Sequence, residues 1–304
     1  MKVKAIRSDK IYSRMLSAGS EKRDDIFRYE LMSPFQYKLD CYHIPLKAAS
    51  KDGYDIIMAC RMLGLLVPDD FSGETKAQNE LLSDNDLWQR CTDSIVHSLE
   101  CFEKAGIFPP VHEYIFSVLL ANGNNAYTAM NGNYCGDGGI PGYIMAWLVP
   151  NKSTLPRLHA ALAHETNHNV RFQYQKWHND ITLGEMIVSE GLAECFAVEL
   201  YGEEFAGPWV THTDMDKDGR EIRRKIHQAL DVQGLEQLNA YLYGDEMAEM
   251  QGYFPVGLPY CAGYACGYHL IRHFLKKTGI SIPQATIMPA EDILKNAEDF
   301  WDDK

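Results

Sequence analysis

The sequence is poor in basic residues: 29 lysines and arginines stand against 42 aspartates and glutamates, which gives a formal net charge of −13. Nucleic acids and anionic membranes are bound through basic faces, so this deficit argues against both as partners. Long hydrophobic runs are also lacking. The longest strongly apolar stretch, Tyr143 to Val149, is far shorter than the roughly 20 residues of a membrane-spanning helix. We therefore expect no nucleic-acid partner and no membrane insertion.

The chain also lacks a CxxC pair, although it has eight cysteines. Its first residues, MKVKAIRSDK, are charged and contain no apolar run like that of a secretory signal. Scattered cysteines in such a chain are typical of reduced thiols. We therefore expect a cytoplasmic protein whose fold depends on neither disulfides nor a four-cysteine zinc knuckle.

Hydrophobic residues make up 46% of the 304, enough for one large domain or two lobes, and no repeat is visible. Apolar, β-prone segments predict strands at 1–6, 114–120 and 142–150, with a glycine- and asparagine-rich loop at 122–139. Helices are predicted at 24–41, 46–66, 84–105, 153–174, 183–201, 218–241, 257–277 and 289–300. The hydrophobic patterns and the order of these strands and helices along the chain predict a predominantly helical α+β fold. They place a mixed α/β lobe at 1–175 and a helical lobe at 176–304.

Residues 164–168 read His-Glu-Thr-Asn-His. In a helix, His164 and His168 lie one turn apart on the same side, where two imidazoles can bind one tetrahedral ion. Glu165 falls near the same side and can take a proton from a bound water. HExxH fixes only three positions and also arises by chance, so a second signal is needed.

The second signal is Ser-Glu-Gly-Leu-Ala-Glu at 189–194. Glu190 follows His168 by 22 residues, and Glu194 lies one helical turn further on, among apolar residues. Two carboxylates on an apolar face are costly unless a cation meets them. We assign Glu190 as the third metal ligand and Glu194 as the acceptor of a ligand histidine's free N–H. The alternative is that both acids are solvated and that the opposite side of the helix is the buried one.

These motifs, followed by AGYACGYHLI at 262–271, resemble the Predicted Zn-dependent protease family of the gluzincin clan of zincin metallopeptidases. The resemblance spans about residues 140–300 and leaves residues 1–110 unmatched. It implies the zincin-like fold, one zinc ion on His164, His168 and Glu190, and Glu165 as catalytic base. It also implies a small sheet whose edge strand, here 142–150, precedes the HExxH helix and binds a peptide or protein substrate. Because no linker separates the two lobes, we expect a single catalytic domain at 1–304.

Three protein ligands leave zinc an open position for water, as catalytic sites require. The oxyanion formed during hydrolysis usually meets a second donor besides the metal. Tyr260, Tyr264 and Tyr268 are one helical turn apart; we favour Tyr264 as this catalytic donor, then Tyr268, with His269 as a substrate contact. The alternative is that the tyrosines are an aromatic core stripe.

The resulting functional hypothesis is zinc-dependent hydrolysis of peptide bonds. The alternatives are a zinc-stabilised binding or chaperone-like module without turnover, and a zinc hydrolase with a non-peptide substrate. The intact Glu165 favours an enzyme, because a structural site gains nothing from a base. Residues 214–219 match the first half of a calcium-binding EF-hand loop, but Lys225 stands where the bidentate glutamate of such a loop belongs. An acidic loop before a helix explains these acidic residues equally well.

Overall fold

The structure is a computed structural model that describes residues 1–50 and 53–302. The chain divides into two compact units: unit 1 comprises Met1–His97 and Val111–Glu165, and unit 2 comprises Ser98–Pro110 and Thr166–Lys304. Of the three boundaries between them, two fall within helices, α6 (Asn85–Lys104) and α8 (Leu158–Tyr174). The single catalytic domain in two lobes stays a prediction.

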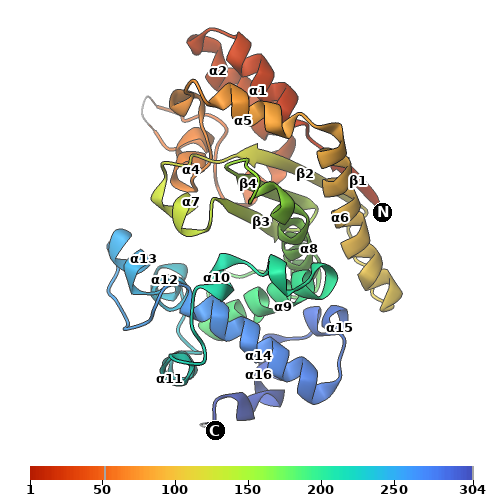
Figure 1. Ribbon diagram of the computed structural model, residues 1–304, viewed down its shortest axis with the longest axis vertical. Helices are drawn as coiled ribbons and strands as arrows, with labels where there is room; N and C mark the ends of the chain where they lie inside the picture. Colours follow the sequence, from red (N-terminus) through yellow and green to blue (C-terminus); the bar gives the residue numbers. More distant parts are fainter. Residues whose placement is uncertain (51–52, 303–304) are drawn as a thin grey trace. The chain divides into compact units, whose positions relative to one another are not determined.

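Unit 1 contains a four-stranded sheet in the order β1-β2-β4-β3 (Figure 1). β1 (Lys2–Ala5) and β4 (Tyr143–Leu148) both run parallel to β2 (Glu113–Leu120), and β3 (Tyr134–Ile140) is antiparallel to β4. The strands predicted at 1–6, 114–120 and 142–150 are therefore confirmed. With helices forming most of the described chain, the predicted α+β class is confirmed as well.

The prediction that 142–150 forms the edge strand is wrong. β4 is an inner strand between β2 and β3, and β3 is an edge. β3 comes from the segment that we assigned to a loop, which also contains the short helix α7 (Ala126–Met130). The sequence Tyr-Cys-Gly-Asp-Gly-Gly-Ile has few residues with high β-propensity, so its pairing with β4 is not visible in the local pattern.

The N-terminal helices of unit 1 bury a core that includes Tyr12, Phe27 and Phe35. The predicted helix at 24–41 is a run of helical turns with changing pitch, from α2 (Ser20–Ile26) through π-helical and 3₁₀ turns to α3 (Gln36–Cys41). Helices α1 (Ser8–Ser17) and α5 (Thr75–Leu82) are additions to the prediction. They lie beside α2 in Figure 1.

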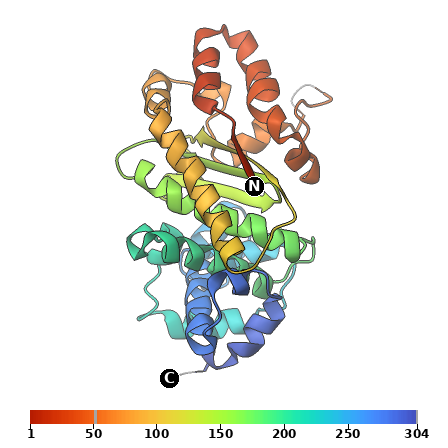
Figure 2. The same ribbon diagram turned by 90° about the vertical axis from the view of Figure 1, so that its right-hand side faces the viewer.

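The predicted helix at 46–66 is wrong in extent, because in the described part of this range only α4 (Ile56–Met62) is an α-helix; residues 51 and 52 lie outside the described residues. Asp55 starts α4 by accepting hydrogen bonds from the N–H groups of Ile57 and Met58. The first half of α6 crosses one face of the sheet (Figure 2), where Trp88 packs on Phe116 of β2 at a ring separation of 6.0 Å.

In unit 2, α9 (Leu183–Tyr201) packs against α14 (Ala262–Thr278). A capping box starts α9: Thr182 Oγ1 accepts from Glu185 N, and the Glu185 carboxylate accepts from Thr182 N. The predicted helix at 218–241 is two helices, α11 (Gly219–Gln228) and α12 (Leu235–Tyr243).

Around this pair lie the shorter helices α10 (Pro208–Thr211), α13 (Asp245–Met250), α15 (Ile282–Thr286) and α16 (Ala290–Asn296). Within the described residues, no helix is long and apolar enough to cross a membrane.

Candidate metal centre

α8 places the two histidines of the HExxH motif one turn apart, as the spacing predicts. A 3₁₀ turn over Leu155–Arg157 precedes this helix and contains Pro156. The side chain of Thr154 does not cap the helix but donates to Val149 O. His164 and His168 are both buried, with exposed fractions of 5% and 7%.

His164, His168 and Glu190 each offer a ligand atom, and these atoms all lie within 4.8 Å of one another. His168 Nε2 is 3.4 Å from Glu190 Oε2. Two ligand atoms about 2.0–2.1 Å from a tetrahedral zinc ion are about 3.4 Å apart, so this pair has the separation that zinc requires. The residues and their spacing thus fit one zinc ion, as the sequence predicts.

Ser189 is a further member of the centre that the sequence analysis missed. Its Oγ lies 3.2 Å from Nδ1 of His168, on the opposite side of the ring from Glu190. A hydroxyl that accepts the Nδ1 proton leaves Nε2 free to bind a metal. Ser189 directly precedes Glu190, so the same turn of α9 supplies a ligand and a support for another ligand. The serine directly before Glu190 in the sequence was the signal that could have indicated this contact with His168.

The close approach of α9 and α14 fixes the position of this turn. Gly191, next to Glu190, faces Gly267 of α14, and a Cβ added at Gly191 would lie 2.5 Å from the carbonyl carbon of Gly267. A Cβ added at Gly267 would in turn meet the backbone of Ile187. Neither position has room for a side chain, so the two glycines allow the backbones to touch.

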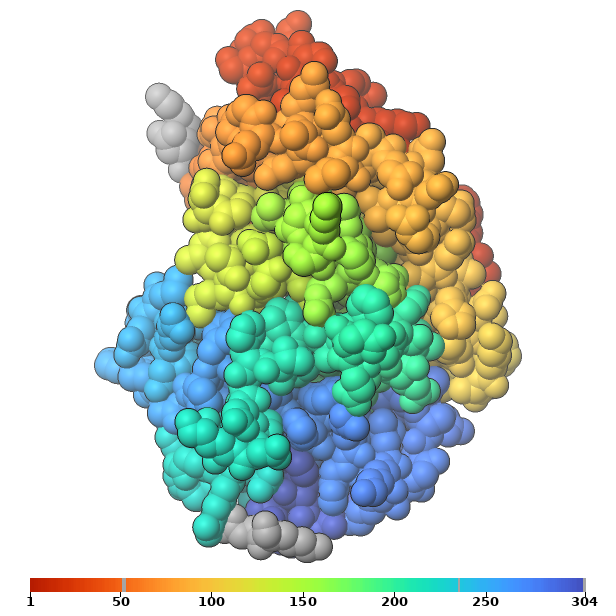
Figure 3. All heavy atoms as spheres, viewed as in Figure 1, coloured from red at the N-terminus to blue at the C-terminus, as the bar shows by residue number. Residues whose placement is uncertain are grey.

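Glu194 is buried, with an exposed fraction of 2%. Its two carboxylate oxygens accept hydrogen bonds from the backbone N–H of Gly207, at 2.6 Å, and from the indole N–H of Trp209, at 2.8 Å. The partner residues belong to the segment around α10, which lies at the surface in the view of Figure 3. That Glu194 also supports a ligand histidine stays a prediction.

Glu165 is buried, and its Oε2 accepts a hydrogen bond from the backbone N–H of Gly138 at 2.6 Å. The loop predicted at 122–139 is wrong for Asp137, Gly138 and Gly139, because they lie in β3. A Cβ added at Gly138 would lie 2.7 Å from the backbone carbonyl carbon of Glu165. Close approach to α8, rather than flexibility, is therefore what requires glycine here.

The predicted oxyanion donors have protein partners. Tyr264 donates to the hydroxyl of Tyr243 at 3.0 Å. Tyr268 donates to Glu203 at 2.8 Å; burial and then this hydrogen bond raise the pKa of its hydroxyl. His269 is exposed. The roles of Tyr264, Tyr268 and His269 in hydrolysis stay predictions.

The acidic loop at 214–219 forms a local turn, in which Asp214 accepts from the backbone N–H groups of Asp216 and Lys217. Across the described ranges, the two histidines and Glu190 are the one group of three ligand side chains close enough to hold a metal ion. This favours the interpretation of an acidic loop before α11 over a calcium site.

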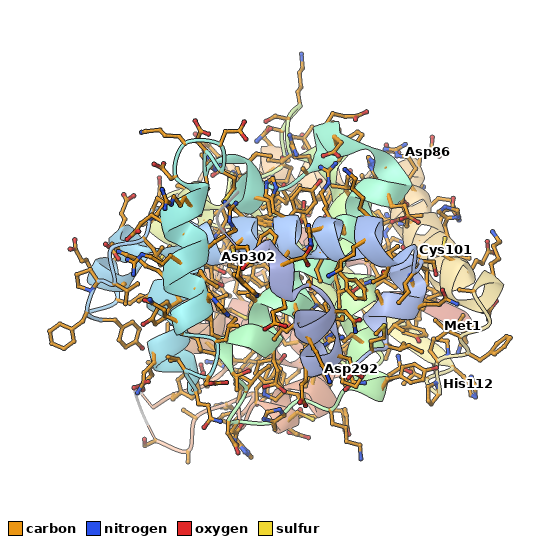
Figure 4. The ribbon with its side chains drawn as sticks, turned by 90° about the horizontal axis from the view of Figure 1, so that it is seen from below. Met1, Asp86, Cys101, His112, Asp292 and Asp302 are labelled. Atoms are coloured by element: carbon orange, nitrogen blue, oxygen red, sulfur yellow. The ribbon has the colours of Figure 1, made fainter. Side chains whose placement is uncertain are left out.

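A cavity of about 850 Å³ also occurs in unit 2. Its lining includes Glu185, His227 and Trp301 but none of the three candidate metal ligands. The rings of His227 and Trp301 are stacked at 5.0 Å. Figure 4 labels the residues that follow two of the lining residues in sequence, Asp292 and Asp302. Because none of the three candidate metal ligands lines this cavity, we assign it no part in the proposed hydrolysis.

The sequence of the chain is similar to those of known proteins over most of its length. It is 38% identical over 285 residues to the uncharacterized protein YjfC of Bacillus subtilis (strain 168), which covers 93% of this chain and 94% of that protein. It is 28% identical over 137 residues to the uncharacterized protein YjaZ of the same organism, which covers 44% of this chain and 49% of that protein. No solved structure matches the chain.

The model of one protein family, described as Predicted Zn-dependent protease (DUF2268), matches residues 87–295. This span contains α8 and α9, and with them His164, His168 and Glu190. The chain belongs to this Predicted Zn-dependent protease family.

Proposed function

We propose that this protein is a metallopeptidase that hydrolyses peptide bonds with one zinc ion held by His164, His168 and Glu190. The observation that carries the proposal is the 3.4 Å separation of His168 Nε2 and Glu190 Oε2 within a group whose ligand atoms lie within 4.8 Å. Membership of a family described as zinc-dependent proteases supports the same metal.

The second support is that a base stands beside these ligands. When bound, zinc supplies a Lewis acid that polarises the scissile carbonyl and lowers the pKa of an attacking water. Glu165 takes the proton from that water and delivers it to the leaving amine nitrogen. The backbone N–H of Gly138 binds one carboxylate oxygen of Glu165 at 2.6 Å, which helps to hold the carboxylate in one orientation.

A direct test pairs zinc analysis with hydrolysis of a diverse peptide library, for the wild type and the Glu165→Gln variant. The matched control is Glu199→Gln, which removes an exposed carboxylate from α9. We expect about one zinc per chain in all three proteins. Hydrolysis should fall by a factor of about 100 or more in Glu165→Gln alone, because general bases contribute at least that much.

Other results would reject the proposal in distinguishable ways. Equal hydrolysis by the wild type and Glu165→Gln would show that Glu165 is not the base. Stoichiometric zinc with no cleavage of any peptide would replace the peptidase by a binding module, or by a hydrolase of another bond if a non-peptide ester or amide is cleaved.

A further inference from the structure

Lys38 of α3 is a fully buried lysine, with an exposed fraction of 1%. Burying an ammonium group is costly unless it is paired, and lysines are rarely buried without a reason. Its Nζ lies 2.6 Å from Oδ1 of Asp137 in β3, 99 residues further along the chain. Lys38 precedes residues 87–295, so the match to the family model does not include it.

Asp137 connects Lys38 to the glycine segment of β3. Its Oδ1 also accepts hydrogen bonds from the hydroxyl of Tyr42, at 3.2 Å, and from the backbone N–H of Gly139, at 2.9 Å. Burial raises the pKa of this carboxyl, but the charge of Lys38 and the hydrogen bonds lower it by more, so its net pKa lies below the usual range. Asp137 is thus an anion held at one oxygen by a side chain from α3.

The neighbour of Asp137 is the donor to Glu165. Gly138 gives its N–H to Glu165 Oε2 at 2.6 Å, and a Cβ added at Gly138 would collide with the backbone of Glu165. Gly136 faces the same glutamate: an added Cβ would lie 2.5 Å from its Cγ. A shift of this segment would therefore move the N–H of Gly138 relative to the Glu165 carboxylate.

We propose that Lys38 is a positioning residue for Glu165: it anchors Asp137, and so holds the N–H of Gly138 against the glutamate carboxylate. The proposal rests on the assignment of Glu165 as the catalytic base. It gives the N-terminal region, for which the sequence offers no motif, a part in the site. The competing explanation is that Lys38–Asp137 only stabilises the fold of unit 1.

The experiment compares Lys38→Met, which roughly keeps the length of the side chain but removes its charge, with Lys38→Arg, which keeps the charge. Arg28→Met is the matched control, because it removes another cation of the same unit, a partly buried one that pairs with Asp55 at 2.8 Å. A double variant, Lys38→Met with Asp137→Asn, avoids leaving a partly buried carboxylate without its cation and serves if the single variant fails to fold.

The first readout is independent of any activity: the amide proton of Gly138, observed by NMR after ¹⁵N-glycine labelling. A short hydrogen bond to a carboxylate moves this proton downfield. The Glu165→Gln variant gives the chemical shift of the Gly138 amide proton in the absence of the carboxylate. We expect Lys38→Met, or the double variant in its place, to move the signal toward that position, Lys38→Arg to restore part of the shift, and Arg28→Met to leave it unchanged.

The second readout is zinc content with kcat and KM. We expect Lys38→Met to keep its zinc and KM and to lose about 10- to 100-fold in kcat, since a misplaced base costs rate rather than binding. A folded variant, single or double, with the wild-type Gly138 signal overturns the proposal. Should wild-type protein cleave no peptide, the proposed function fails while the Gly138 signal still decides the role of Lys38.

Discussion

Replacing Gly191 by alanine tests how the crossing of α9 and α14 holds Glu190. In the middle of an exposed helix this change stabilises by about 1 kcal/mol, because alanine is the better helix former. Here the added Cβ would lie 2.5 Å from the carbonyl carbon of Gly267 and 2.8 Å from Cγ1 of Ile271. Ordinary van der Waals contacts begin near 3.4 Å, so the two helices must separate by about 1 Å.

The size of the effect follows from these opposing contributions. Overpacking a core costs about 1–3 kcal/mol, and the obstacle here is backbone, which cannot rotate away, so the cost falls at the upper end. Subtracting the gain in helix propensity, we expect Gly191→Ala to lower the free energy of unfolding by about 2 kcal/mol.

The assay is urea unfolding followed by circular dichroism, with a chelator present so that metal binding does not add to the stability. Gly219→Ala is the control, because its added Cβ would lie no closer than 3.4 Å to any atom. The free energy of unfolding of Gly219→Ala should stay the same or rise by less than about 1 kcal/mol. An equal or higher free energy of unfolding for Gly191→Ala would refute the claim that these helices touch through their backbones.

Two further predictions concern carboxylates that are bound by protein groups. Trp209→Phe removes the indole donor to Glu194 and should lower the free energy of unfolding by about 1–3 kcal/mol in urea titrations; no change would mean that this hydrogen bond contributes nothing. Asp137 has a lowered pKa in the folded state, so its contribution is complete above its unfolded pKa of about 3.9 and is lost as the pH falls further. The stability difference between wild type and Asp137→Asn should therefore be constant above about pH 5 and shrink below about pH 4; a difference independent of pH would contradict the lowered pKa.

Features that depend on neighbouring residues were predictable from the sequence. The spacing of His164 and His168 follows from helix geometry alone, and the Thr182–Glu185 capping box is a four-residue pattern. Glu190 could be proposed as a ligand because a carboxylate on an apolar helix needs a partner, but the same requirement holds for Glu194, where the N–H groups of Gly207 and Trp209 meet it.

Features that depend on distant pairing were not predictable. β3 was assigned to a loop because its glycines have low β-propensity, yet contact with Glu165 requires them. The partnership of Lys38 with Asp137 spans 99 residues and has no local signature. The contact between Ser189 and His168 depends on how α9 meets α8, which periodicity does not specify.

The central claim is that His164, His168 and Glu190 hold zinc, and the most direct test is the zinc content of the purified protein after loading and dialysis against metal-free buffer. We predict about one zinc per chain for the wild type, loss of most of it in Glu190→Ala, and better retention in Glu194→Ala, whose carboxylate is bound by Gly207 and Trp209. A wild-type protein that retains no zinc after loading would contradict the account.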